Sequence, residues 1–403
     1  MPEVRAISDA ELPAMLEVDR RGFGAPPRAS DRADSWVRAE LDRTRCAFES
    51  GTLVGCSRAY TFEMTMPGGA SVPVAGVSAV AVQPTHRRRG ALTAMMGALH
   101  DDARARGEVA SVLTASESVI YKRFGYGAGT WKLGASIARG YARLAQPVRD
   151  TGRVRLVSRG EADPLFRDIY ERAQRARAGM VSRPDFWWPE VFWIPEGNRA
   201  FFDAVHEDAD GQADGYVAYE VRGEWYGGFA DRELHVLDLQ ATDAAARAAL
   251  WEFVFGVDLV VKIIATNLPI DEPLRFMLAD PRQLRTDFVY DSLWVLPIDV
   301  AALLSARMYA SAGLLTIEVV EPGGPKGRFV LDGGPDGASC IESPDATPDL
   351  TCPYAALGAA LLGGNAWATL AEAGEVDEHT PGTLARADAM FTTAPAPATL
   401  TWF

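Results

Sequence analysis

Apolar residues recur along the chain at two spacings, and these spacings predict a mixture of helices and strands. Residues 11–23 and 90–106 place apolar side chains three to four positions apart, as amphipathic helices do. Residues 45–62, 77–82 and 109–115 are rich in β-branched and other apolar residues, which is typical of strands. Because one helix separates the last two strands, we expect them to be parallel neighbours in an α/β sheet.

A second series of elements begins after Pro147 and repeats this layout. It comprises strands at 154–157, 215–221, 233–239 and 259–265 and helices at 163–177 and 241–255. The order of strands, helix and strand echoes that of the first segment, so a second copy of the same architecture is predicted. We therefore expect a first domain over residues 1–148 and a second over residues 149–293.

The remaining residues, 294–403, form a third predicted domain. Its elements are helices at 300–307 and 354–362 and strands near 315–320 and 328–332. The chain ends in the apolar run 398–403, which is unusual because chain termini normally fray in water. We therefore expect Trp402 and Phe403 to be buried or docked.

Composition and charge narrow the classes of protein. With 403 residues the chain is too long for one hydrophobic core. A net charge of −14 makes nucleic acid a poor partner and favours cationic ligands. Apolar stretches such as 259–264 are too short to span a membrane and no signal peptide is evident, so a cytoplasmic protein is expected. The four cysteines lack metal-ligand spacing, so no metal site is expected. The apolar cluster Phe186-Trp187-Trp188 is interpreted as an exposed surface of a homo-oligomer.

The segment from Val80 to Ala91 carries the most distinctive chemistry. A β-branched strand ends at Pro84 and is followed by three arginines, Gly90 and a helix. At such a turn the free N–H groups and the dipole of the helix attract negative charge, and a glycine lets a phosphate approach the backbone. The alternative is an ordinary strand-to-helix turn with a solvated arginine cluster.

This turn resembles the acyl-CoA pyrophosphate loop of the GNAT N-acetyltransferases, whose pattern is Gln or Arg, two residues, Gly, one residue, and Gly or Ala. Arg87 and Gly90 match that pattern, and Leu92 departs from its last position. More specifically, the chain is similar to the Eis (enhanced intracellular survival) acetyltransferases over essentially its whole length. The further residues that carry this resemblance are Ser116-Glu117, Ile120–Gly127, Met180–Pro184 and Phe403.

The resemblance implies a mixed α/β (α+β) protein. An active GNAT domain is followed by a degenerate GNAT-like copy and a C-terminal domain like those of sterol carrier proteins. It also implies an enzyme that transfers an acetyl group from acetyl-CoA, its cosubstrate, to an amine. The residues implied in binding acetyl-CoA, by phosphate or backbone contacts, are Val80, Ala81, Val82, Arg88, Arg89, Gly90, Ala91, Leu92, Thr93, Ser116 and Glu117.

Two residues are implied in catalysis. Tyr121 matches the general acid of the family, since a phenol with an ordinary pKa of about 10 is protonated at neutral pH and can donate to a thiolate. Tyr126 is the alternative and is expected to pack the turn. The implied general base is the C-terminal carboxylate of Phe403, which burial would strengthen as a base. In a passive alternative this carboxylate anchors an ammonium group while water carries the proton.

The implied substrates are amines of small polycationic molecules, with aminoglycosides as the leading class, or lysine side chains. Trp36, Trp294 and Trp402 are predicted to wall the substrate pocket with aromatic faces that attract cations. The family also implies a homohexamer. Two other functions stay open: a long-chain acyl-CoA N-acyltransferase similar to the N-myristoyltransferases, and a non-enzymatic protein that binds small molecules or lipids.

Overall fold

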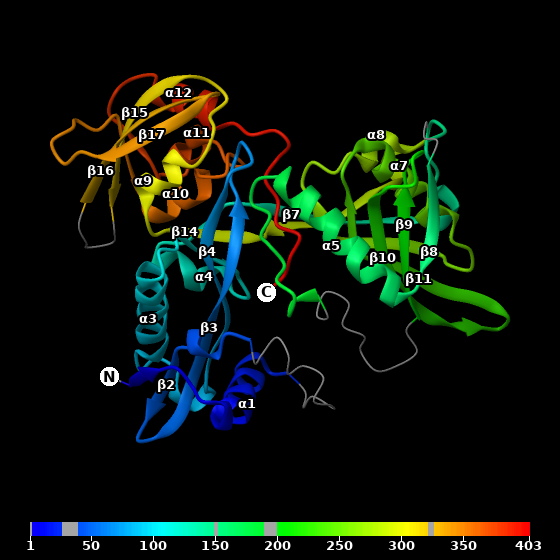
Figure 1. The fold of residues 1–403 in the computed structure, drawn as a ribbon, viewed down its shortest axis with the longest axis horizontal. Coiled ribbons are helices and arrows are strands. Elements are labelled where there is room, and N and C mark those ends of the chain that lie inside the picture. Colours follow the sequence, from blue (N-terminus) through cyan, green and yellow to red (C-terminus); the bar gives the residue numbers. More distant parts are fainter. Residues whose placement is uncertain (1, 26–38, 149–151, 189–199, 321–325) are drawn as a thin grey trace.

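Three β-sheets with their helices make up the protein in a computed structural model, which describes residues 2–25, 39–148, 152–188, 200–320 and 326–403. In Figure 1 the third sheet lies above the first, and the second sheet lies to one side of both. The C-terminus lies between the first and second domains (Figure 1). Among the described residues, no helix is long and apolar enough to cross a membrane.

The first sheet contains seven strands in the order β1-β2-β3-β4-β5-β14-β6. These strands are β1 (Glu3–Arg5), β2 (Cys46–Glu49), β3 (Thr52–Thr65), β4 (Ser71–Val82), β5 (Ala110–Thr114), β14 (Leu293–Pro297) and β6 (Gly127–Ala128). Its helices are α1 (Leu12–Phe23), α3 (Ala91–Ala105) and α4 (Ser118–Tyr121). Strands β4 and β5 are parallel neighbours joined through α3, as the apolar pattern predicts.

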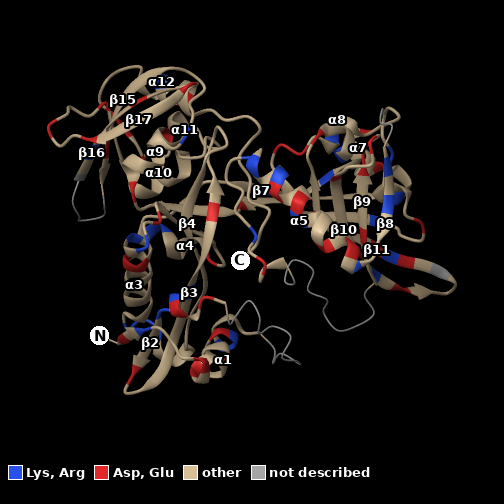
Figure 2. Ribbon diagram, viewed as in Figure 1, with Lys and Arg blue, Asp and Glu red and all other residues tan. Residues whose placement is uncertain are grey.

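The second sheet also contains seven strands, in the order β13-β7-β12-β11-β10-β9-β8. They are β13 (Arg285–Asp291), β7 (Trp131–Ala138), β12 (Lys262–Pro269), β11 (Phe229–Ala241), β10 (Ala213–Tyr226), β9 (Ala200–Glu207) and β8 (Arg153–Val157). Its helices are α5 (Arg159–Arg175), α7 (Ala244–Gly256) and α8 (Leu274–Met277). Strands β11 and β12 are parallel and joined through α7, which repeats the arrangement of β4, α3 and β5. Acidic and basic side chains alternate along α5 and form ion pairs four residues apart (Figure 2).

Each of these two sheets contains one strand that its position in the chain would place in the other sheet. Strand β7 precedes the second series of elements in the chain but pairs with β12 and β13. Strand β14 follows that series and pairs with β5 and β6 of the first sheet. This exchange crosses the predicted domain boundaries near residues 148 and 293. An apolar run predicts a strand but does not specify its partner, so the sequence could not indicate the exchange.

The third sheet has the order β17-β16-β15-β18-β19. Its strands are β15 (Gly313–Val320), β16 (Lys326–Gly334), β17 (Gly337–Glu342), β18 (Leu350–Pro353) and β19 (Asp377–Glu378), and its helices are α9 (Val300–Ser305), α10 (Tyr354–Ala360), α11 (Trp367–Glu372) and α12 (Thr383–Phe391). Helix α10 lies so close to the first sheet that a Cβ atom at Gly127 would be 1.8 Å from the carbonyl oxygen of Ala355. One apolar core is therefore continuous from the first sheet into the third domain.

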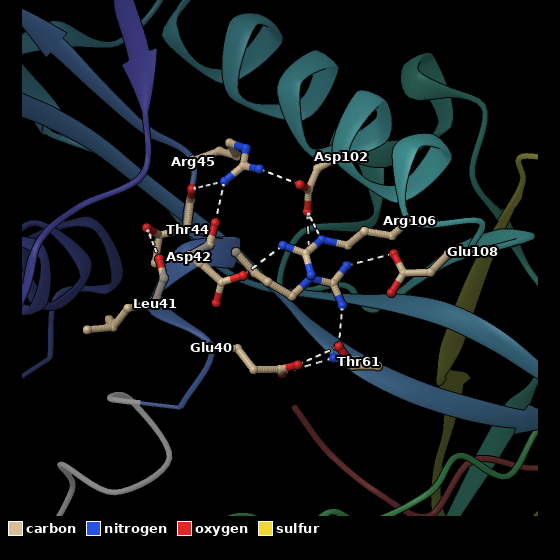
Figure 3. A network of polar contacts seen from close by, with 10 residues as sticks. Glu40, Leu41, Asp42, Thr44, Arg45, Thr61, Asp102, Arg106 and Glu108 are labelled. Atoms are coloured by element: carbon tan, nitrogen blue, oxygen red, sulfur yellow. Dashed lines mark hydrogen bonds and ion pairs between the residues drawn. The ribbon is translucent and has the colours of Figure 1, made fainter.

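A buried polar network attaches the C-terminal end of α3 to β3 and the segment before β2 (Figure 3). Arg43 donates to Glu108 (2.6 Å) and to Thr61 (2.7 Å), and Arg106 donates to Asp102 (3.0 Å). Burial raises the pKa of Glu108, an effect that Arg43 opposes. Arg43 also lies 3.6 Å from Asp102, so removing Arg43 would take the partner from the buried Glu108 carboxylate and weaken the link to α3. The network holds α3 in place and thereby positions its N-terminus.

The predicted exposure of the Phe186-Trp187-Trp188 cluster is wrong. Trp187 is 5% exposed and Trp188 is 3% exposed. The ring of Trp187 lies edge-on to Tyr60 of the first domain at 5.4 Å, whereas Trp188 packs edge-on against Tyr170 of the second. These indoles are covered where the two domains meet within one chain, so they give no support to a surface between subunits.

Candidate active site

Strands β4 and β5 separate at their carboxyl ends and leave an opening in the first sheet. Their parallel pairing ends at Val77 and Leu113. Beyond that point β4 continues to pair with β3 on its other side, across a bulge at which Ala79 adopts a φ of 52°. Val80 and Val82 therefore have a backbone edge that β5 does not cover. Ligands of open α/β sheets bind in this kind of opening.

The N-terminus of α3 lies next in the chain. Gly90 is its N-cap, with a φ of 86°, and Arg88 has a φ of 62°. No side chain caps this helix, and its first turn carries no acidic residue. Arg89 lies 3.4 Å from Glu49, whereas Arg88 is exposed and has no hydrogen bond or ion pair with the described residues. The N–H groups of residues 91–93 together with the Arg88 guanidinium can therefore receive an anion.

Residues on the other side of the opening follow β5. Ser116 and Glu117 are exposed, and Glu117 is the N-cap of the short helix α4. The residues that the resemblance implies for acetyl-CoA thus all lie beyond the point at which the parallel pairing of β4 and β5 ends. Leu92, the departure from the loop pattern, is half-buried against the core beneath α3.

Tyr121 ends α4 and is buried. Its ring lies edge-on to that of Tyr126, with 6.0 Å between ring centres. Its hydroxyl makes no hydrogen bond within the part of the chain that the structure describes. Burial, and to a lesser extent Glu117, raise the pKa of Tyr121 to about 12. The phenol is therefore protonated at neutral pH and free to donate.

Tyr126, the alternative acid, has its hydroxyl engaged on two sides. Ser111 Oγ lies 2.6 Å from it and His100 Nε2 lies 3.0 Å from it. All three residues are buried, and burial lowers the pKa of His100 to about 4. The Tyr126 hydroxyl thus connects β5 to α3.

Phe403 lies next to the carboxyl end of β5 and packs on the other face of the first sheet from Tyr121. Its ring is 6% exposed and meets the ring of Phe62 edge-on, with 5.0 Å between centres. Thr114 Oγ1, at the end of β5, donates a hydrogen bond of 2.9 Å to the main-chain oxygen of Phe403. A Cβ at Gly76 would lie 2.3 Å from the Phe62 ring, so glycine at this position of β4 makes room for the aromatic pair.

The prediction that Trp402 is buried or docked is wrong, because this residue is 76% exposed. Residues 398–401 and Phe403 are all buried. Successive side chains of an extended chain point in opposite directions, so Trp402 faces solvent where its two neighbours face the protein.

Tyr121 and Phe403 lie on opposite faces of the first sheet. Tyr121 packs in the apolar cluster that contains Leu113, on the face covered by α3, whereas Phe403 packs in the cluster that contains Val112. Thr114 has the same orientation along β5 as Val112 and so shares the face of Phe403. The first sheet therefore lies between the ring of Tyr121 and the ring of Phe403.

The remaining residues predicted for the substrate pocket are only partly placed. Trp36 lies outside the described residues. Trp294 is 8% exposed on β14, packs in the cluster that contains Tyr121, and donates from Nε1 to Asp291 (2.6 Å). A hollow of about 480 Å³ lies between the end of α1 and the turn at residues 83–85, with Arg20 and Arg21 in its lining.

Sequence reasoning missed Thr114, Phe62 and Gly76. No local pattern marks them, because their roles depend on a contact with a residue at the other end of the chain.

Comparison with known proteins identifies each part of the chain. Residues 3–129 and residues 179–296 both match models of the acetyltransferase (GNAT) domain, and residues 300–399 match the sterol carrier protein domain. The fold and the opening in the first sheet thus define an acetyltransferase with two GNAT domains, which confirms the predicted fold class.

Relatives that match most or all of the chain narrow the assignment to one family of acetyltransferases. The chain is 38% identical over 402 residues to an uncharacterized N-acetyltransferase of Streptomyces avermitilis, covering 98% of each protein. It is 35% identical over 350 residues to the N-acetyltransferase Eis of Mycobacterium tuberculosis, covering 84% of this chain and 83% of that one. The crystal structure of Eis1 from Mycobacterium abscessus superimposes over the full length of both chains with a TM-score of 0.89 at 35% identity. The chain therefore belongs to the Eis family of N-acetyltransferases.

A more distant structure shows how widely the fold is shared. A GCN5-related N-acetyltransferase from Anabaena variabilis superimposes with a TM-score of 0.87 at only 17% identity. At that identity the likeness concerns the fold alone.

Proposed function

We propose that this enzyme transfers the acetyl group of acetyl-CoA to an amine of a small polycationic molecule, aminoglycosides being the leading class, or of a lysine side chain. Enzymes of the GNAT family use acetyl-CoA. The observation that carries the proposal is the hydrogen bond from Thr114 to Phe403, because it brings the end of the chain to the opening between β4 and β5.

Acetyl-CoA enters this proposal as a substrate held by the turn before α3. Arg88 and Arg89 supply positive charge, and the N–H groups of residues 91–93 supply donors for the phosphates. The open backbone edge at Val80 and Val82 receives the pantetheine arm in place of a neighbouring strand, with one N–H aimed at the thioester oxygen. Ser116 and Glu117 flank the opening from the side of β5.

In this proposal the chemical step uses Tyr121 and Phe403, which pack on opposite faces of the first sheet. The carboxylate of Phe403 takes a proton from the substrate ammonium, and the resulting amine attacks the thioester carbonyl to form a C–N bond. The C–S bond then breaks, and Tyr121 gives its proton to the leaving thiolate. The second proton lost by the nitrogen restores Tyr121. The net result is an amide, free CoA thiol and one proton released.

The chemistry of the surroundings supports a cationic substrate. The protein carries a net charge of −14, which attracts polycations. Trp402, next to Phe403 in the chain, is 76% exposed and offers an aromatic face to a cation, whereas Trp294 is 8% exposed and packs in the cluster of Tyr121. We assign Trp36 to the same pocket on the resemblance.

The proposal also includes a cytoplasmic homohexamer, as the family resemblance implies. The aromatic tip of the β10–β11 hairpin supports self-association, because Trp225 and Tyr226 are 57% and 83% exposed. Light scattering of the purified protein tests this part by itself.

The test of the function is release of free thiol from acetyl-CoA in the presence of single amines, with mass spectrometry of the products. We expect release with polyamines, aminoglycosides or lysine peptides and a mass increase of one or more acetyl groups. Faster turnover with myristoyl-CoA would contradict acetyl transfer. Absence of thiol release with every amine would contradict an enzymatic role for this site.

A further inference from the structure

The last residues of the chain pass through the second domain before they reach the first. Ala398 and Leu400 pack in the core of the second domain, whereas Phe403 packs in the core of the first. This segment belongs to no strand and is held by individual contacts. The Ala398 N–H donates to Ala178 O (3.0 Å), and Ser292 Oγ donates to Thr399 O (3.0 Å).

Arg183 makes the central contact of this segment. Its Nε donates to Thr401 Oγ1 (2.8 Å) and its Nη2 donates to Leu400 O (3.3 Å). Its Nη1 is held by Asp238 Oδ2 at 2.7 Å. The side chains of Arg183 and Asp238 are 2% and 4% exposed. A buried guanidinium with donors on three sides holds its partners in one geometry.

Neighbouring side chains complete the arrangement around Thr401. The guanidinium lies 3.8 Å from the centre of the Tyr170 ring. The Tyr170 hydroxyl donates to Val181 O (2.7 Å), so in its 2.6 Å contact with Thr401 the threonine hydroxyl is the donor. Thr401 thus accepts from Arg183 and donates to Tyr170. Its hydroxyl therefore makes two hydrogen bonds, two residues before Phe403.

Asp238, which holds Arg183, lies in the second sheet at the position that corresponds to the opening between β4 and β5 of the first sheet. The parallel pairing of β11 with β12 ends at Val236 and Ala265, just as that of β4 with β5 ends at Val77 and Leu113. Asp238 and Asn267 follow two positions later on β11 and β12. Asn267 Nδ2 donates to Leu400 O (2.8 Å), so the chain's own C-terminal segment lies at this opening.

We propose that Arg183 is a positioning residue for catalysis, which acts through Thr401 and Leu400 to fix the terminal carboxylate of Phe403 at the active opening. In this account the second domain, which lacks the basic glycine turn, uses its sheet opening to hold the C-terminal segment instead of a second acetyl-CoA. The inference rests on the proposed function, because it assigns the carboxylate of Phe403 a role in the reaction. A misplacement of about 1 Å at a reacting group can cost on the order of 100-fold in rate.

The first test replaces Thr401 by valine, which keeps the shape and removes both hydroxyl contacts. We expect kcat to fall about tenfold or more, while KM for acetyl-CoA changes less than twofold, since the phosphate-binding turn is untouched. Thr401→Ser keeps the hydroxyl and is expected to remain within about threefold of the parent. Thr383→Val is the matched control, because Thr383 is a buried threonine of α12 whose hydroxyl accepts one hydrogen bond from Arg386 (3.1 Å).

A merely structural role for Thr401 predicts a different pattern. Thr401→Val and Thr383→Val would then lose thermal stability alike and keep the same kcat, which would overturn the inference. The double variant Arg183→Met/Asp238→Asn provides a second test that leaves no buried charge unpaired. We expect it to show the same fall in kcat at unchanged KM for acetyl-CoA, and full activity in the folded double variant would equally overturn the inference.

Failure of the inference can be told apart from failure of the proposed function. A chain extended by two alanines after Phe403 lacks the carboxylate at its present position. If the extended chain is fully active, the carboxylate has no role and the proposed mechanism is wrong. If the extended chain is inactive while Thr401→Val is fully active, the mechanism stands and the positioning role of Arg183 is refuted.

Discussion

Thr114 and Phe403 are 289 positions apart in the chain and are joined by a hydrogen bond of 2.9 Å at the carboxyl end of β5. This contact places the end of the third domain's sequence at the opening in the first domain's sheet. The second domain guides the intervening residues there. All three domains therefore contribute to one candidate site.

Loss of the Thr114 hydroxyl should weaken catalysis more than cosubstrate binding. In Thr114→Val the Phe403 oxygen loses its donor, while the turn at residues 88–93 stays intact. We expect kcat to fall about tenfold, in line with the 0.5–3 kcal/mol or so that such a hydrogen bond contributes, with KM for acetyl-CoA unchanged. Steady-state kinetics measure both constants, and a rise in KM alone would show that Thr114 serves binding instead.

Tyr121 and Tyr126 should respond differently to loss of their hydroxyls. Tyr121→Phe removes the proposed proton donor, so kcat should fall by a factor of about 10² to 10⁴ with little effect on stability. Tyr126→Phe leaves Ser111 and His100 without their shared partner and should lower the unfolding free energy by about 1–3 kcal/mol. Kinetics and urea unfolding of both variants separate the roles. Equal turnover by Tyr121→Phe and the parent would remove Tyr121 from the mechanism.

The alkaline pH dependence follows from the raised pKa of Tyr121. Burial shifts this pKa upward to about 12, so the proton that the acid must donate is retained well above pH 10. We therefore expect kcat at saturating substrates to show no decrease between pH 8 and about pH 10.5. A decrease with a midpoint near the ordinary phenol pKa of about 10 would contradict the assignment. Tyr121→Phe serves as the control for any other titrating group.

Arg88 should serve acetyl-CoA binding alone. Its exposed guanidinium has no partner among the described residues, so Arg88→Ala removes a phosphate contact without breaking an internal one. We expect KM for acetyl-CoA to rise several-fold to about tenfold at unchanged kcat, and the effect to shrink as salt is added. Arg104→Ala, which removes an exposed arginine paired with Asp101 on α3, is the matched control. An equal effect of the two substitutions would argue against a phosphate contact at Arg88.

Local sequence patterns predict those parts of the candidate site that are formed by one continuous segment of the chain. The strand, the turn and the helix from Val80 to Ala105 are contiguous, so spacing and residue type were enough to locate them. The apolar end of the chain indicated docking, and burial of Phe403 confirms that for its last residue. The exposure of Trp402 contradicts the prediction of docking one position earlier. Neighbouring side chains of an extended segment point in opposite directions, and the sequence does not tell which of them face the protein.

Contacts between distant segments could not be predicted in the same way. The partner of β7, the burial of Trp187 and Trp188, and the contact between Thr114 and Phe403 all depend on how three domains meet. Arg183 and Asp238 are 55 positions apart and carry no motif of their own as a pair. Such pairs are specified by packing, which one sequence does not display.

The central claim is that the C-terminal carboxylate of Phe403 acts as the base of the reaction. The most direct measurement compares kcat of the protein with that of a semisynthetic chain whose terminal carboxylate is a carboxamide, a group of nearly the same size that cannot take up the proton. The account predicts a fall in kcat of about 100-fold or more at unchanged KM for acetyl-CoA and unchanged melting temperature. Full activity of the carboxamide protein would contradict it.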